Sequence, residues 1–190
     1  MLLRHLFSIL ALPVMVIIIL PIMLVSFFTY VPFWGFPSHS AMFLLVVGVI
    51  LIVLGVILLY STILAFIRKG DGTIAPWDST RRLAVTGFYS HVRNPMHIGV
   101  FLILIGESVV AGSISLTIWT WLFIIGNLIY IPIIEEQKLE ERFGGEYLIY
   151  KKNVPMWIPR LSSWKPDSKT LKQSSLDTSQ FIFTNIPRTL

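Results

Sequence analysis

Two polar clusters in this chain carry the residue types that could do chemistry. The first is Arg93-Asn94-Pro95, with His97 close behind it, and the second is Glu135-Glu136. The stretch between them is mostly apolar. Charged residues at the end of a membrane span are costly unless they have a role. The two clusters therefore suggest one polar pocket at a membrane surface, with a cation on one wall and carboxylates on the other.

The first cluster has the features of an anion site. Pro95 disfavours helix at Asn94 and is suited to the first turn of a helix. The free N–H groups and the partial positive charge of a helix start attract a carboxylate. Arg93 adds a fixed cation, and Asn94 and His97 add hydrogen-bonding groups. Taken alone, Arg93 is better explained as a side chain that snorkels to the interface.

The second cluster, Glu135-Glu136, is predicted to close the last apolar helix. Carboxylates at a helix C-terminus oppose the macrodipole, which indicates a function such as binding an ammonium group. The alternative is that they begin an exposed amphipathic helix, because charges of both signs follow as far as Arg142. Both interpretations hold if one carboxylate faces the pocket and the other faces water.

The composition places both clusters in an integral membrane protein. Hydrophobic residues make up 55% of the 190 residues and charged ones only 13%, whereas soluble domains average about 25% charged residues. Mean hydropathy is +0.77. Four apolar segments are expected to be helices, and the first two are long enough to span a bilayer, which takes about 20 residues. The segments cover about residues 6–30, 41–67, 96–110 and 114–134.

Two features shape these helices. Pro13 and Pro21 lie inside the first segment and should kink it. Ala111-Gly112-Ser113 leaves room only for a tight turn, so the last two segments should form a hairpin. The expected fold is therefore an all-α integral membrane protein with about four transmembrane helices. A cytosolic loop and a C-terminal amphipathic helix should form the pocket.

The distribution of charge predicts the topology. Lysine and arginine gather in residues 68–93 and again after residue 134, while residues 31–40 and the Gly112 turn have none. Such residues favour the cytoplasm, so both termini and both polar clusters should be cytosolic. The net charge of +5 is explained in this way, and no nucleic-acid partner is expected. The chain lacks cysteine, and its four histidines are scattered, so no metal site is expected.

The chain divides by composition into three parts. Residues 1–67 hold two N-terminal transmembrane helices, residues 68–160 the core with the hairpin, and residues 161–190 a polar, weakly ordered tail. The irregular loop over residues 70–78 is a lid over the pocket or a plain connector. An aromatic stripe near the end of the core should lie on the membrane surface or fold back onto the bundle; it comprises Leu139, Phe143, Tyr147 and Tyr150.

Two polar residues lie within the last two spans. Glu107 and Asn127 could face each other across the hairpin or line an acceptor pocket, since intramembrane ionisable residues are usually functional. Alternatively, the tight hairpin puts Glu107 near the far interface, where it costs little.

Taken together, these residues resemble the isoprenylcysteine carboxyl methyltransferase superfamily, which includes membrane phospholipid N-methyltransferases. Its signature is Gly-x-Tyr-x-x-x-Arg-His-Pro-x-Tyr-x-Gly, a hydrophobic hairpin, a Glu-Glu pair and Phe-Gly-x-x-Tyr-x-x-Tyr. The similarity covers about residues 70–160, with Asn94 and His97 in place of the usual His and Tyr. The matching positions are Gly87, Tyr89, Arg93, Asn94, Pro95, His97, Gly99, Glu135, Glu136, Phe143, Gly144, Tyr147 and Tyr150.

The resemblance implies S-adenosylmethionine as methyl donor. Its carboxylate would meet the Arg93-Asn94 helix start, and its ammonium would meet Glu135 or Glu136. The implied cofactor-binding residues are Leu83, Tyr89, Arg93, Asn94, Pro95, Met96, His97, Glu135 and Glu136. Arg93, His97 and Glu136 are the implied catalytic residues. Tyr89, Met96 and His97 would pack around the adenosine, and backbone from Leu83 to Thr86 would form the adenine edge.

The implied acceptor is lipophilic and enters from the membrane lipid. It is an isoprenylcysteine-type carboxylate, which needs no general base, or a lipid amine, whose proton His97 or a carboxylate could accept. Residues 130–134 lack the arginine that precedes the Glu pair in the isoprenylcysteine enzymes, so the acceptor stays open. The alternatives are a membrane reductase with a nicotinamide cofactor and a non-enzymatic membrane protein built on the same hairpin.

Overall fold

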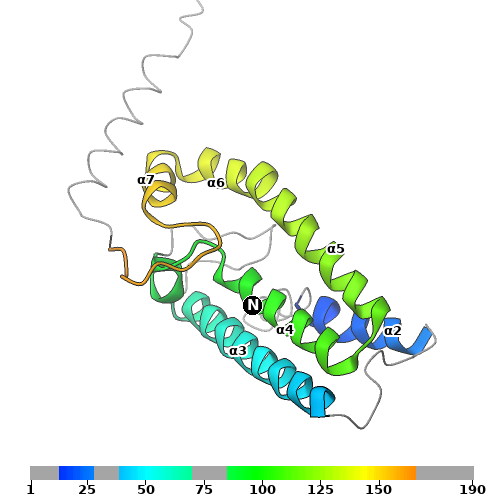
Figure 1. Cartoon of the computed structure of the whole chain (residues 1–190). Helices are drawn as coiled ribbons and strands as arrows, with labels where there is room; N and C mark the ends of the chain where they lie inside the picture. The colour runs from blue at the N-terminus through cyan, green and yellow to red at the C-terminus, as the bar shows by residue number, and fades with distance from the viewer. Residues whose placement is uncertain (1–12, 28–38, 70–84, 166–190) are drawn as a thin grey trace, which may run out of the picture.

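The computed structural model describes residues 13–27, 39–69 and 85–165 (Figure 1). Every regular element in these residues is helical, which confirms the expected all-helical fold for them. The elements are η1 (Met15–Ile19), α2 (Leu20–Phe27), α3 (His39–Lys69), η2 (Gly87–Ser90), α4 (Pro95–Ala111), α5 (Ile114–Tyr130), η3 (Ile131–Glu135), α6 (Glu136–Phe143) and α7 (Gly145–Asn153). The loop predicted over 70–78 and the chain after residue 165 lie outside the described residues.

Two helical runs among the described residues are long and apolar enough to cross a membrane. They are Ala41–Ala65 within α3 and Ile114–Phe143, which joins α5, η3 and α6. Met15–Phe27 and Pro95–Ala111 are shorter apolar helices. The outer face of α3 exposes large side chains such as Phe43, which is 68% exposed, and Ile57, which is 54% exposed. An apolar surface of this extent is suited to lipid rather than to water.

Glycines bring α3 and α4 into close contact along their length. A Cβ atom built on Gly106 would lie 2.6 Å from the carbonyl oxygen of Gly48, and one on Gly55 would lie 2.7 Å from that of Gly99. Small residues allow membrane helices to approach in this way. Beside the glycines, the main core cluster packs between α3 and α4; it consists of Leu59, Val100, Ile103 and Leu104.

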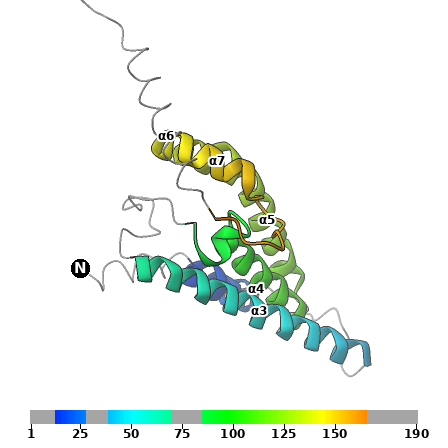
Figure 2. The same ribbon diagram turned by 90° about the vertical axis from the view of Figure 1, so that its left-hand side faces the viewer.

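The predicted hairpin turn is confirmed. Gly112 ends α4 in the left-handed region with φ 59°, and the Ser113 side chain caps α5 by accepting from the Leu116 amide. Thr120 Oγ1 donates to the Leu104 carbonyl at 3.2 Å and joins the two arms. Beyond this contact α4 stays beside α3, while α5 diverges toward α6 and α7 (Figures 1 and 2).

One expectation about α5 is wrong: the helix does not close at residue 134. It continues through η3 into α6 and ends at Phe143. Pro132 has no N–H to donate, and here the backbone switches to a π turn in which the Glu136 amide donates to Ile131. Glu135 and Glu136 therefore lie inside a helical run, and the macrodipole argument for them does not apply. A second π turn, η1, lies between Pro13 and Pro21, and there the Leu20 amide donates to the Met15 carbonyl.

The aromatic stripe folds back on itself at a glycine corner. Gly144, with φ 53° and ψ −130°, separates α6 from α7. Tyr147, Tyr150 and Val154 form a second buried cluster against Leu139 and Phe143 of α6, and Val85 and Trp164 complete it. The four residues of the predicted stripe thus meet across two short helices instead of lying along one.

Glu107 and Asn127 lie at different depths of the hairpin. Glu107 is close to the Gly112 turn, whereas Asn127 is close to the other end of α5, and each residue of helix advances the chain by about 1.5 Å. Asn127 Nδ2 donates to the Phe123 carbonyl of its own helix at 2.8 Å. This arrangement favours the interpretation that Glu107 lies near the far interface.

The glycine contacts predict a clear difference between two substitutions. Gly106→Ala forces its new methyl group against the Gly48 backbone and the Ile52 side chain, so we expect it to destabilise the protein by about 1–3 kcal/mol. Gly126→Ala, where a Cβ meets nothing within 4 Å, is the control and should leave stability unchanged. Thermal unfolding in detergent measures both, and equal melting temperatures for the two variants would contradict the close packing.

Candidate functional site

The site begins at the short segment that leads into α4. The 3-10 helix η2 starts at Gly87, whose φ of 60° favours glycine, and Ser90 Oγ donates to the Gly87 carbonyl. Val92 is buried, and the Arg93 amide donates to the Pro155 carbonyl at 2.9 Å. Pro95 then opens α4, as predicted. The backbone of Arg93 is thus fixed by buried Val92 and the hydrogen bond to Pro155 on one side and by the start of α4 on the other, independently of its side-chain contacts.

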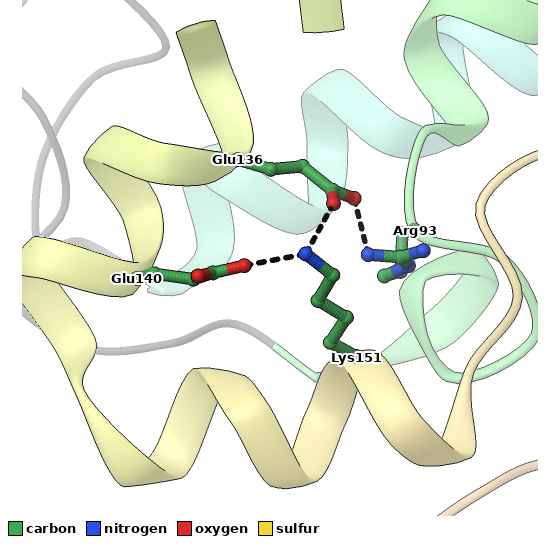
Figure 3. A network of polar contacts seen from close by, with 4 residues as sticks. All are labelled: Arg93, Glu136, Glu140 and Lys151. Atoms are coloured by element: carbon green, nitrogen blue, oxygen red, sulfur yellow. Dashed lines mark hydrogen bonds and ion pairs between the residues drawn. The ribbon is translucent and has the colours of Figure 1, made fainter. Parts of the chain in front are cut away.

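An ion pair joins the two polar clusters of the sequence. Arg93 Nη1 donates to Glu136 Oε1, and the side chains are only 9% and 3% exposed (Figure 3). The start of α4 is thereby connected to the point where η3 becomes α6. The prediction that the two clusters meet is confirmed. Arg93 and Glu136 contact each other directly, whereas the sequence suggested that they would lie on opposite walls of a pocket.

Lys151 of α7 binds the same carboxylate from the other side. Its Nζ lies 3.0 Å from Glu136 Oε2 and 2.5 Å from Glu140 Oε1 (Figure 3). The hydrogen bonds to Glu140 and Glu136 raise the pKa of Lys151, so it stays charged. Both oxygens of Glu136 are therefore engaged by cations.

Buried donors without acceptors lie next to this pair. Among the described residues, Arg93 Nε and Asn94 Nδ2 are buried and have no hydrogen-bond partner. The Asn94 side chain does not cap α4, and the amides of Met96 and His97 have no intrahelical acceptor at a helix start. Buried donors in proteins are almost always satisfied. This group of donors fits a bound anion such as a carboxylate.

Residues 154–164, which follow α7, form a clasp over residues 90–93, which precede α4: the two segments are joined by hydrogen bonds. The Arg160 and Trp164 amides donate to the carbonyls of His91 and Ser90, each at 3.0 Å. Ser163 Oγ lies 2.9 Å from Ser90 Oγ, within hydrogen-bond distance. These contacts hold residues 154–164 across residues 90–93 and include two residues that the sequence assigned to the polar tail.

Three tyrosines, Tyr89, Tyr147 and Tyr150, contribute to the site around the ion pair. Tyr150 Oη donates to the Tyr89 carbonyl at 2.8 Å. Burial raises the pKa of the Tyr89 phenol, with smaller contributions from Tyr150 and Glu135. Burial and then Glu136 raise the pKa of Tyr147, while Arg93 opposes them. All three phenols stay neutral at physiological pH.

Aromatic rings extend from the site toward the hairpin. The His97 and Phe101 ring centroids are 6.5 Å apart, and Phe101 stacks on Trp157 at 5.6 Å. Phe101 also meets Phe123 of α5 edge-on at 6.2 Å. An apolar surface therefore adjoins the polar cluster directly.

The structure brings most of the predicted site residues together. Arg93, Asn94, Pro95 and Glu136 meet at one point, and Met96 and His97 occupy the first turn of α4. Glu135 is half-buried and directly precedes Glu136. Leu83 lies outside the described residues.

The sequence reasoning missed Lys151 and Glu140. The spacing of Glu136 and Glu140 was a signal, because residues four apart share one face of a helix.

Comparison with known proteins gives one match. A family model described as phospholipid methyltransferase matches residues 43–146, just over half of the chain. The matched region includes α4, α5, the Arg93 segment and the Glu135-Glu136 pair. No curated protein matches this chain, and no solved structure does.

The buried ion pair predicts a strong effect of its acidic member on stability. Glu136→Gln leaves the Arg93 guanidinium buried without a counterion, so we expect it to lower the free energy of unfolding by about 3 kcal/mol. Glu140→Gln is the matched control: its side chain is 32% exposed, and the cost should stay below about 1 kcal/mol. Denaturant titration in bicelles compares them, and similar costs would contradict a buried pair.

The Tyr150 hydrogen bond predicts a pH-dependent effect. Burial raises the pKa of Tyr150 in the folded protein, so its neutral phenol adds stability below about pH 10, and that stability is lost as the pH rises further. Tyr150→Phe should cost about 1 kcal/mol at neutral pH and should reduce the loss of stability above pH 10. Tyr130→Phe, at a residue that is 48% exposed, is the control. In the same unfolding titrations it should neither lower the stability at neutral pH nor change the loss of stability at high pH.

Proposed function

The chain belongs to the phospholipid methyltransferase family, and on that premise we propose that it transfers a methyl group from S-adenosylmethionine to a lipophilic acceptor in the membrane. The observation that carries this proposal is the set of unpaired buried donors at the start of α4, Arg93 Nε and Asn94 Nδ2. They fit the carboxylate of this donor, which would also receive the Met96 and His97 amides.

The ammonium group of the donor would bind Glu135. Both oxygens of Glu136 are engaged by Arg93 and Lys151, so the neighbouring carboxylate is the one left for a ligand. Tyr89, Met96 and His97 would pack around the adenosine. The backbone near Leu83 would form the adenine edge.

Methyl transfer from a sulfonium mainly requires alignment and the exclusion of water. When bound, the donor supplies an activated methyl group. Arg93 and Glu136 act by holding the site in register, and the His97, Phe101 and Trp157 rings exclude water beside it. For an amine acceptor, His97 is the side chain placed to accept a proton, because it lies on the first turn of α4.

The acceptor proposed first is the amine of a phospholipid, in line with the description of the family. No basic residue follows Asn127 in α5 and η3, so nothing there would hold the carboxylate of an isoprenylcysteine. The acceptor would reach the site from the bilayer, beside the exposed apolar face of α5, where Trp121 and Ile125 are at least half exposed.

The membrane arrangement that fits this function has four spans and a cytosolic site. We place both termini in the cytosol, because lysine and arginine gather in the two regions that form the site, residues 68–93 and the residues after 134. The 17 residues of α4 extend about 26 Å, close to the roughly 30 Å of a hydrocarbon core. We keep the division into residues 1–67, 68–160 and 161–190, with most of the site in the middle part and Ser163 and Trp164 of the last part bound to Ser90.

A binding experiment tests the function directly. The purified full chain should bind S-adenosylhomocysteine in calorimetry, and Arg93→Met should abolish binding because it removes the cation at the helix start. Lys152→Met is the control, since Lys152 is exposed and should bind as the wild type does. With radiolabelled donor, label should enter amine phospholipids before prenylcysteine analogues. Binding of a nicotinamide cofactor in place of the adenosyl compound would instead support the reductase alternative.

A further inference from the structure

Lys151 engages the site carboxylate that already binds Arg93. It reaches from α7 and bridges Glu136 Oε2, at 3.0 Å, and Glu140 Oε1, at 2.5 Å (Figure 3). Glu140 is partly exposed and Glu136 is buried, so the ammonium is held between an outer and an inner carboxylate. Two anchors of this kind leave Lys151 little freedom to move.

This contact changes how Glu136 can bind Arg93. A carboxylate and a guanidinium that meet freely tend to form a bidentate pair with two parallel hydrogen bonds. Here Glu136 gives one oxygen, Oε1, to Arg93 Nη1, and Lys151 holds the other. Arg93 also interacts with the Tyr147 hydroxyl, and its Nε, which a bidentate pair could use, is buried without an acceptor.

We propose that Lys151 is a positioning residue for the methyl donor. By occupying Glu136 Oε2, it restricts Glu136 to a single-point contact with Arg93 and keeps Arg93 Nε available to the donor's carboxylate. Without Lys151, Glu136 turns both oxygens to Arg93 and competes with the ligand for the guanidinium. This inference rests on the proposed function. It adds an explanation of how the site comes to prefer a methyl donor that carries a carboxylate.

The test compares two ligands that differ only in that carboxylate. Calorimetry with the purified full chain measures S-adenosylhomocysteine and its decarboxylated analogue, which keeps the amine, on Lys151→Met, Lys151→Arg and Lys152→Met. We expect Lys151→Met to weaken the binding of S-adenosylhomocysteine by about tenfold, as for one lost hydrogen bond to a charged group. The affinity for the decarboxylated analogue should stay unchanged. Lys151→Arg should restore binding, and Lys152→Met should equal the wild type.

The outcomes separate this inference from the proposed function. If the wild type binds neither ligand, the proposed function is overturned and the inference with it. If the wild type binds and Lys151→Met binds S-adenosylhomocysteine equally well, or loses both ligands to the same extent, only the role of Lys151 is overturned. If Lys151 only stabilises the fold, Lys151→Met should weaken the binding of both ligands to the same extent, because a loss of stability does not distinguish them. If Lys151→Met does not fold, Lys151→Gln provides the same comparison.

Discussion

The buried ion pair between Arg93 and Glu136 is the interaction on which the rest of the site depends. Removing two charges from water is costly, and the attraction between them compensates only where geometry and further hydrogen bonds are good. Lys151 supplies a second cation to the carboxylate, and the Pro155 carbonyl fixes the backbone of Arg93. The pair joins the two outer ends of the hairpin and so sets the distance between arms that otherwise diverge.

The rigidity that this pair requires comes from outside the hairpin. Gly48 and Gly55 let α3 lie directly against Gly99 and Gly106 of α4, so α4 is aligned by α3 more than by α5. The α5 arm is held by the Thr120 contact, by the packing of Phe123 against Phe101 and, further along the helical run, by Glu136 at the site. Its outer face exposes Trp121 and Ile125. A rigid wall on one side and a lipid-facing wall on the other are suited to a fixed donor and a mobile acceptor.

The sequence predicted the helices and the meeting of the clusters because both depend on strong local signals. Pro95 after Asn94 marked the start of α4, and Gly112 marked the turn. The end of α5 could not be predicted in this way, because a proline and a change to charged residues usually end a helix. At Pro132 a π turn carries the helix onward, and π turns have no clear sequence signal.

The parts of the site that the sequence did not reveal depend on tertiary contacts. Lys151 was one of several basic residues in a charged segment, and only the corner at Gly144 brings it back to Glu136. The clasp of residues 154–164 over residues 90–93 is made largely by backbone groups, which any sequence can supply. A motif records side-chain types, so it carries no trace of such contacts.

The contacts of residues 154–164 with residues 90–93 also depend on residues that are synthesised late. The carbonyls of Ser90 and His91 receive their partners from Trp164 and Arg160, which leave the ribosome after every apolar helix described here. The apolar helices are therefore synthesised before the residues that cover the Arg93 segment. The polar site can therefore be fully covered only after residues 160–164 have been synthesised.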